Sequence, residues 1–348
     1  MSERITYSQL FDLLRDPETT DDALKEYFTV VPGTGGLDFQ LEINPDKVIM
    51  TEADLEMESA MGIGNGAFRL MRVRRYNRGR RKHPERPVLL SEGDSWFQFP
   101  LLIKETIDHL SNHYNIWSLG AAGDTLANMI GHENGGSGFE FIQELRRIGP
   151  DVSAFLFSAA GNDILGEDPK DGLPMLQSLL RPFNGNPADF EGHIDAHALD
   201  ARMASLEAGY LKMIALIRAE PGCEALPIII HGYDYAFPYP ASDKDPRKPI
   251  HAKKDQWLGR AFAAQGINDP HLRHEIIKRL VDRLYSMMDG LETKAKTKGI
   301  WVVNCRGALP KVTDWADEIH GTSDGFAKVA GRFHKVIESA LAQRAALS

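Results

Sequence analysis

The 348-residue chain has little cysteine and no long apolar run. Its two cysteines, Cys223 and Cys305, can form neither a disulfide framework nor a zinc site made of cysteines alone. No apolar run approaches the roughly 18 residues that a transmembrane helix requires. The first ten residues, MSERITYSQL, have neither the basic nor the apolar region of a secretory signal. We therefore expect a soluble, cytoplasmic protein.

The chain also lacks an excess of positive charge. It has 40 Lys and Arg against 49 Asp and Glu, a formal net charge of −9, so it is not built as a general polyanion binder. Hydrophobic residues make up 43% and charged residues 26%, which is typical of globular domains and argues against a disordered or fibrous chain. At about 150 residues per domain, this length predicts roughly two domains.

The pattern of apolar residues changes near residue 86. Before it, helical spacing occurs in segments 7–14, 21–28 and 51–78, the last with a glycine-rich interruption. Alternation at 39–43 and a turn into 48–49 predict a strand pair. We expect residues 1–86 to form a small N-terminal α+β extension that ends in a basic linker.

After residue 86, short apolar runs alternate with longer helical stretches. The runs, which are rich in β-branched and aromatic residues, are 87–95, 114–120, 152–163, 226–234 and 300–307. The helical stretches are 98–111, 124–147, 200–219, 271–298 and 323–345. Continuous apolar runs are typical of strands that are buried on both faces of a parallel sheet. The alternation therefore predicts a doubly wound α/β domain over 87–348, in which ligands bind at the carboxyl ends of the strands.

The residues that follow these runs are those that an acyl-transfer site needs. The first run ends in Gly93-Asp94-Ser95, the second leads to Gly123, the third ends in Gly161-Asn162-Asp163, and Asp317 and His320 follow the fifth. A serine hydroxyl needs an adjacent base to become a nucleophile, and His320 is the candidate base. Asp317 lies three residues earlier, which on a helical turn would put both side chains on one face.

Three donors could stabilise the oxyanion of a tetrahedral intermediate. They are the Ser95 N–H, the Gly123 N–H and the Asn162 side-chain amide. We expect Asp94 to hold the Ser95 loop rather than to take part in the chemistry. Each of these short motifs also occurs by chance in ordinary loops. Their conjunction, in this order and at strand ends, favours a catalytic site.

Together these four blocks resemble the SGNH/GDSL hydrolases, a family named for its Ser, Gly, Asn and His. Ser95 matches the nucleophile, Gly123 and Asn162 match the oxyanion residues, and Asp317 and His320 match the Asp-x-x-His block. The resemblance covers roughly 87–345. It implies a flavodoxin-like three-layer α/β/α sandwich with five parallel strands, and ester hydrolysis without a metal or organic cofactor.

The sequence departs from the family pattern at two positions. Trp96 follows the nucleophile where Leu or Ile is common, and Gly321 replaces a frequent proline after the histidine. Neither change removes a catalytic group, and Trp96 is a candidate wall of the pocket. We expect four further residues to support the site or to line it: Asp94, Trp96, Asp163 and Tyr233.

Two long connections are candidates for covering the site. Residues 233–275 begin at the carboxyl end of a predicted strand and are rich in aromatic residues and proline. Residues 166–199 form a second long connection that could also cover the site. Long loops at such positions are often functional, but a surface excursion packed on the domain is an equal alternative. We expect possible lid insertions at 166–199 and 233–275.

A basic run at 72–86 has eight Lys and Arg and one acid in an otherwise acidic chain. Such a run is a candidate contact for an anionic partner, but it is more often a solvated segment that pairs with acidic neighbours.

The sequence thus favours a serine esterase or acyl hydrolase with a Ser95–His320–Asp317 triad. Two alternatives remain open. One is an interaction or signalling module that uses the basic N-terminal segment, and the other is an acyltransferase with the same catalytic residues. The ester, the acyl group and the oligomeric state are not encoded in these patterns.

Overall fold

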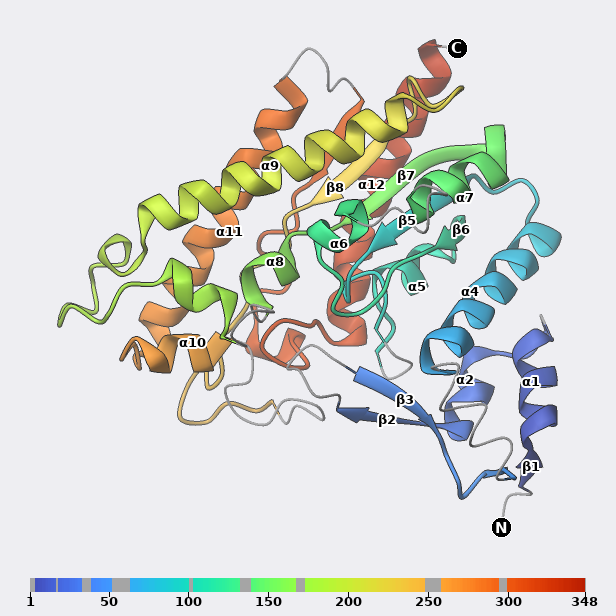
Figure 1. The fold of residues 1–348 in the computed structure, drawn as a ribbon, viewed down its shortest axis with the longest axis horizontal. Coiled ribbons are helices and arrows are strands. Elements are labelled where there is room, and N and C mark those ends of the chain that lie inside the picture. Colours follow the sequence, from blue (N-terminus) through green and yellow to red (C-terminus); the bar gives the residue numbers. More distant parts are fainter. Residues whose placement is uncertain are drawn as a thin grey trace.

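A computed structural model describes most of the chain (Figure 1). The described residues are 4–16, 18–32, 39–51, 63–99, 103–131, 139–166, 173–247, 258–293 and 299–347.

The centre of the fold is a parallel five-stranded sheet. Its strands are β5 (Val88–Gly93), β6 (Asn115–Ser118), β7 (Val152–Ser158), β8 (Ile228–His231) and β9 (Ile300–Val303). They lie in the order β6-β5-β7-β8-β9, and every adjacent pair is parallel. All of β5 and all but one residue of β7 are buried, as expected for strands covered on both faces. Each predicted apolar run contains one strand, so the predicted fold class is confirmed.

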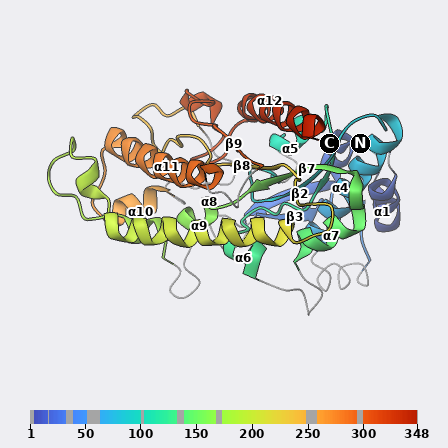
Figure 2. The ribbon, with the colours of Figure 1, turned by 90° about the horizontal axis from the view of Figure 1, so that it is seen from above.

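Helices cover both faces of this sheet. The helices described after β5 are α5 (Thr106–Leu110), α6 (Leu126–Gly131), α7 (Glu140–Ile148), α8 (Gly161–Leu165), α9 (Ala196–Arg218), α10 (Leu258–Ala264), α11 (Pro270–Thr293) and α12 (Ser323–Leu347). Short 3₁₀ turns occupy Gly149–Asp151, Met175–Leu179, Glu191–His193 and Val312–Asp314. α5 and α12 pack on one face, α7 and α9 lie on the other, and α11 contacts α9 (Figure 2). Among the helices of the described ranges, none is long and apolar enough to cross a bilayer.

The predicted stretches 98–111 and 124–147 are less helical than their periodicity suggested. Only α5 forms in the described part of the first, and the second contains two separate helices, α6 and α7.

The N-terminal segment has its own small core. It contains β1 (Ile5–Thr6), α1 (Tyr7–Arg15), α2 (Asp21–Leu24), a 3₁₀ turn (Lys25–Tyr27), β2 (Phe28–Pro32), β3 (Phe39–Ile43) and β4 (Val48–Ile49). Leu10, Leu14 and Phe28 pack there with Met71, a residue of the helix that follows. This cluster is separate from the large core around the sheet.

The predicted pairing of 39–43 with 48–49 is wrong. β3 pairs antiparallel with β2, and β4 pairs in parallel with β1. Phe28, placed at the end of a predicted helix, instead begins β2, because this aromatic residue and the β-branched residues that follow it favour a strand. The Asn44 N–H donates to the Tyr27 carbonyl at 2.9 Å, which directs β3 towards β2.

The basic run is mostly helix and not a linker. Residues 72–82 belong to α4 (Ile63–Lys82), which consists largely of Arg and other helix-compatible residues and ends before Pro84. Its positive charges find acidic partners on the α/β domain: Arg75 pairs with Asp108, and Arg80 pairs with Asp151 at 2.7 Å. α4 also contacts the edge strand β6. Whether residue 86 is a domain boundary stays a prediction.

At Gly79, α4 lies close to the edge strand of the sheet. A Cβ atom at this position would lie 2.4 Å from Oδ1 of Asn115, the first residue of β6. The Asn115 side chain is buried and donates to the His83 carbonyl at 2.8 Å, so it is not free to move away. The absence of a side chain at Gly79 therefore allows the helix to pack on the sheet.

We expect Gly79→Ala to lower the free energy of unfolding by about 1–3 kcal/mol, because overpacking outweighs the gain in helix propensity. Gly331 in α12 is the matched control, since a Cβ there meets nothing within 4 Å. Gly331→Ala should raise stability by about 0.5–1 kcal/mol. Urea denaturation of both variants tests this, and equal effects would contradict the close approach.

Candidate active site

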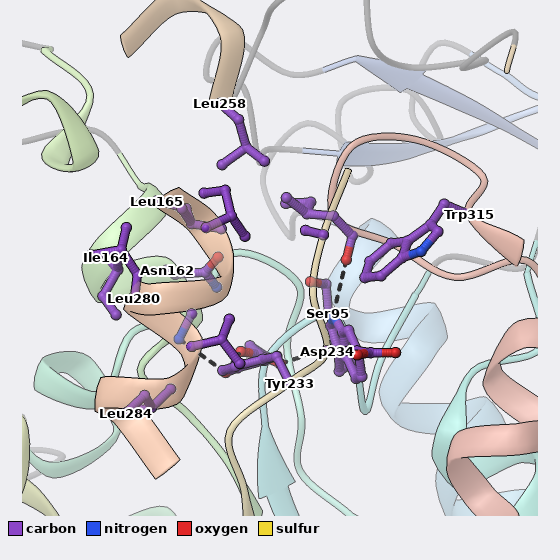
Figure 3. A pocket seen from close by; sticks show the side chains of 17 residues that line it. Ser95, Asn162, Ile164, Leu165, Tyr233, Asp234, Leu258, Leu280, Leu284 and Trp315 are labelled. Atoms are coloured by element: carbon purple, nitrogen blue, oxygen red, sulfur yellow. Dashed lines mark hydrogen bonds between the residues drawn. The ribbon is translucent and has the colours of Figure 1, made fainter. Parts of the chain in front are cut away.

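Ser95 lies on a tight turn immediately after the central strand β5. β5 ends at Gly93, and the Asp94 carbonyl then accepts the N–H groups of Phe97 and Gln98, both at 3.0 Å. The turn places Ser95 at the carboxyl edge of the sheet, where it lines a pocket (Figure 3).

The structure brings Ser95, His320 and Asp317 into one hydrogen-bonded line. Ser95 Oγ lies 2.8 Å from His320 Nε2, and His320 Nδ1 lies 2.7 Å from Asp317 Oδ2. All three residues are buried. The Nδ1–H donates to the carboxylate, so Nε2 is left to accept the serine proton. The ring of Phe99 packs against the imidazole, with centroids 4.5 Å apart, and limits its rotation.

The proximity of Asp317 and His320 does not arise from a helical turn, as the sequence suggested. Residues 316–320 form a loop that is closed by an antiparallel bridge between Trp315 and Gly321. Asp317 Oδ1 accepts the backbone N–H groups of Ile319 and His320, at 2.8 and 2.7 Å. One carboxylate oxygen thus shapes the loop, while the other orients the imidazole.

Asp94 is the centre of a buried network beneath Ser95. Its carboxylate accepts the Trp96 N–H at 3.1 Å, the Ser158 hydroxyl at 2.7 Å and the Tyr233 hydroxyl. His231 lies behind Ser158, with Nε2 2.8 Å from its Oγ. Burial raises the pKa of Asp94 to about 6, against the effect of these hydrogen bonds.

Tyr233 connects this network to the third strand end. Its hydroxyl donates to Asp94 and accepts the Gly161 N–H at 3.0 Å. Tyr233 has a φ of 68°, and Ala160, just before Gly161, has a φ of 86°. Non-glycine residues in this region are uncommon and often lie at functional sites.

The oxyanion candidates lie on neighbouring loops. Asn162 is in α8 and lines the pocket, whereas Gly123, with a φ of 82°, lies in the loop after β6 and does not line it. Asn162 Nδ2 donates to the Asp124 carbonyl at 2.7 Å, which ties the two loops together. Among the residues that the structure describes, the backbone N–H groups of Ser95 and Gly123 have no acceptor.

Asp163 supports these loops and does not line the pocket. Its carboxylate accepts the N–H groups of Leu126 and Ala127, at 2.8 and 3.4 Å, and so caps the beginning of α6.

Trp96 lines the pocket and links the Ser95 turn to the His320 loop. Its Nε1–H donates to the Ile319 carbonyl at 3.0 Å, and its ring meets the ring of Tyr233 edge-on at 5.2 Å. A smaller residue at this position would leave both contacts unmade.

Two buried charges that the sequence did not single out fix the 233–275 connection to this loop. Arg247 pairs with Asp245 at 2.6 Å and donates to the Asp317 carbonyl at 3.0 Å. Glu318 accepts the N–H groups of Tyr239 at 2.8 Å and Leu258 at 3.1 Å. The only sequence signal for Glu318 was its place between Asp317 and His320.

The two expected lids differ in their relation to the pocket. Four described residues of 233–275 line the pocket: Tyr233, Asp234, Ala236 and Leu258. Residues 248–257 of this segment lie outside the described residues. In 166–199, of which 167–172 lie outside, no described residue lines the pocket. A covering role for either segment stays a prediction.

No protein-family model and no curated protein sequence matches the chain. Solved structures that match the chain include the Clostridium thermocellum family 3 carbohydrate esterase, with 13% identity over 74% of this chain and 97% of that one and a TM-score of 0.38. The carbohydrate acetylesterase Est24 from Sinorhizobium meliloti also has 13% identity, over 74% and 100%, with a TM-score of 0.38. A gut microbial diltiazem-metabolizing enzyme has 10% identity over 73% of this chain and 47% of that one, with a TM-score of 0.41. Similarities of this extent do not assign an activity.

Glu92, two residues before Asp94, is a buried carboxyl group with a strongly perturbed pKa. Burial, with the charges of Asp124 and Glu140 nearby, raises the pKa of Glu92 to about 8. The folded protein therefore keeps a proton that the unfolded chain releases near pH 4.5. The contribution of Glu92 to the free energy of unfolding is therefore largest below pH 4.5 and decreases as the pH rises to about 8.

We expect Glu92→Gln to remove this pH-dependent loss of stability, since the amide cannot ionise. The difference in free energy of unfolding between Glu92→Gln and the wild type should grow between pH 5 and 8, by on the order of a few kcal/mol. Above pH 8 the difference should stay constant. Urea denaturation at several pH values measures it. A difference between the two proteins that does not change with pH would show that Glu92 titrates normally.

Proposed function

We propose that this protein is a serine-dependent ester hydrolase of the SGNH/GDSL type. The observation that carries the proposal is the hydrogen-bonded line from Ser95 through His320 to Asp317, at 2.8 and 2.7 Å. A serine, a neutral imidazole and a buried carboxylate in this order form the arrangement that activates a hydroxyl for acyl transfer.

The reaction needs only these groups and water. Ser95 Oγ attacks the ester carbonyl carbon while its proton passes to His320 Nε2. The tetrahedral intermediate collapses, the C–O bond to the alcohol breaks, and the alcohol leaves with that proton. A water molecule then gives a proton to His320 and attacks the acyl-enzyme, and Ser95 takes the proton back as the carboxylic acid leaves.

The negative oxygen of each intermediate needs donors that are already in place. The Ser95 and Gly123 N–H groups, which have no acceptor in the described part of the chain, and the second Nδ2–H of Asn162 are the candidates. Asn162 is held by its bond to the Asp124 carbonyl, so the amide does not need to reorganise during the reaction.

The same residues would also serve transfer to an acceptor other than water. The two reactions share the acyl-enzyme and differ only in what resolves it. Product analysis in the presence of added alcohols separates them, since a transferase yields a new ester and a hydrolase yields the free acid.

We expect Ser95→Ala and His320→Ala to lower kcat/KM for p-nitrophenyl esters by at least about 10³-fold with an unchanged fold. Ser339→Ala, on the exposed surface of α12, is the control and should behave as the wild type. Ester hydrolysis assays and circular dichroism measure both properties. Full activity of Ser95→Ala would contradict the proposal.

A second function is favoured by a basic cleft between α4, α5 and residues 19–25. The cleft has a volume of about 610 Å³. Its lining includes three acids, Asp22, Glu105 and Asp108, and eight basic residues: Lys25, Arg72, Arg74, Arg75, Arg78, Lys82, Arg86 and Lys104. Arg78, Arg86 and Lys104 form no ion pair with any described residue. We propose that this cleft binds a multiply charged anion, independently of Ser95.

Binding of inorganic tripolyphosphate, measured by calorimetry, tests the cleft. We expect affinity to weaken between 50 and 300 mM salt, because salt screens exposed charges that lie farther apart than the Debye length, which is about 10 Å at 0.1 M salt and shortens as salt is added. The double variant Arg78→Glu/Lys104→Glu should bind about tenfold or more weakly, while Lys335→Glu on α12 should not change binding. No binding to the wild type at low salt would refute the proposal.

A further inference from the structure

The pocket beside Ser95 is apolar over most of its wall. α11 contributes Ile277, Leu280, Val281 and Leu284, and α8 contributes Ile164 and Leu165. Figure 3 shows Leu165 and Leu280 on one side of Ser95 and Trp315 on the other. A substrate group that enters this pocket exchanges water for hydrocarbon on both sides.

The polar groups of the wall are mostly used by the protein itself. Asp94 accepts three hydrogen bonds, and Asp234 accepts the N–H groups of Tyr235, Gly307 and Leu309. The Tyr233 hydroxyl both donates and accepts. Among the described lining residues, the groups left for the substrate are the Ser95 hydroxyl, the Ser95 backbone N–H and the Asn162 amide. A sugar ring in this space would leave its hydroxyl groups without partners, which is costly.

The size of the pocket sets the length of the group that fills it. Its volume is about 70 Å³. One water molecule needs at least about 10–15 Å³ by the same measure, so the pocket has room for roughly five to seven water-sized groups. This corresponds to an acyl chain of roughly four to six carbons together with its carbonyl oxygen. An acetyl group would leave most of the apolar wall without contacts.

The position of the outer wall is fixed by the loop that carries the histidine. Leu258, the first residue of α10, lines the pocket, and its N–H donates to Glu318 at 3.1 Å. The Gly259 N–H donates to the same carboxylate at 3.3 Å. These hydrogen bonds therefore fix the position of the pocket wall relative to His320, which lies two residues after Glu318.

On these grounds we propose that the pocket binds the acyl chain of the ester, and that the substrate carries an apolar acyl group of about four to six carbons. This inference rests on the proposed ester hydrolysis. It assigns the acyl side of the substrate to α8, α10 and α11, and the alcohol to the open side of Ser95.

The test is kcat/KM for p-nitrophenyl esters from acetate to decanoate. For the wild type, kcat/KM should rise about fourfold for each added methylene as far as hexanoate and then stop rising. Val281→Phe, which fills part of the pocket with a larger side chain, should reduce the ratio of hexanoate to acetate turnover at least tenfold. The control Ser286→Phe adds the same ring to the exposed side of α11 and should keep the wild-type ratio.

A flat chain-length profile in the wild type, or equal losses on acetate and hexanoate in Val281→Phe, would overturn the assignment. Calorimetric binding of hexanoate and acetate, the acids themselves, separates this failure from failure of the hydrolase proposal. If no ester is turned over but hexanoate binds more tightly than acetate, and Val281→Phe abolishes the difference, the pocket stands and the hydrolase proposal falls. If hexanoate has no advantage over acetate in either measurement, the acyl pocket is refuted.

Discussion

The buried carboxylate of Asp94 is the interaction on which the arrangement of the site depends. It accepts hydrogen bonds from the Ser95 turn through Trp96, from the end of β7 through Ser158, and from the loop after β8 through Tyr233. A charge buried in this way is stable only when it is fully hydrogen-bonded. Because moving any one donor would leave the carboxylate with an unmade hydrogen bond, each of the three donors is held in place. The three strand ends that carry the site are thereby fixed relative to one another.

The loop from Trp315 to Gly321 combines two roles in a few residues. Asp317 and His320 face Ser95, while Glu318, between them, anchors Tyr239 and Leu258 of the 233–275 connection. Arg247 adds a bond to the Asp317 carbonyl. The 233–275 connection, which lines the pocket, is therefore hydrogen-bonded to the loop that carries His320. A change in the connection should alter both the shape of the pocket and the position of His320.

The fold was predictable because five continuous apolar runs require a sheet that is covered on both faces, and parallel strands bring their carboxyl ends to one edge. That edge brings Ser95, Asn162 and His320 together. Other features depend on contacts with no local signal. The spacing of Asp317 and His320 fits a helical turn and a bonded loop equally well. The pairing of β3 with β2 joins residues that are seven (Pro32 and Phe39) to fifteen (Phe28 and Ile43) positions apart, and the course of α4 depends on acids of the α/β domain. The pocket wall comes from α11, roughly 180 residues after Ser95, and its apolar face has the periodicity of any core helix.

The central claim is that Ser95 is a nucleophile activated by His320, and covalent labelling tests it most directly. The protein is treated with a fluorophosphonate, and the modified residue is identified by peptide mass spectrometry, with His320→Ala as the comparison. The account predicts a single adduct on Ser95, formed at least about 10²-fold more slowly in His320→Ala because the general base is lost. An adduct on another residue, or labelling of Ser95 at the same rate in both proteins, would contradict it.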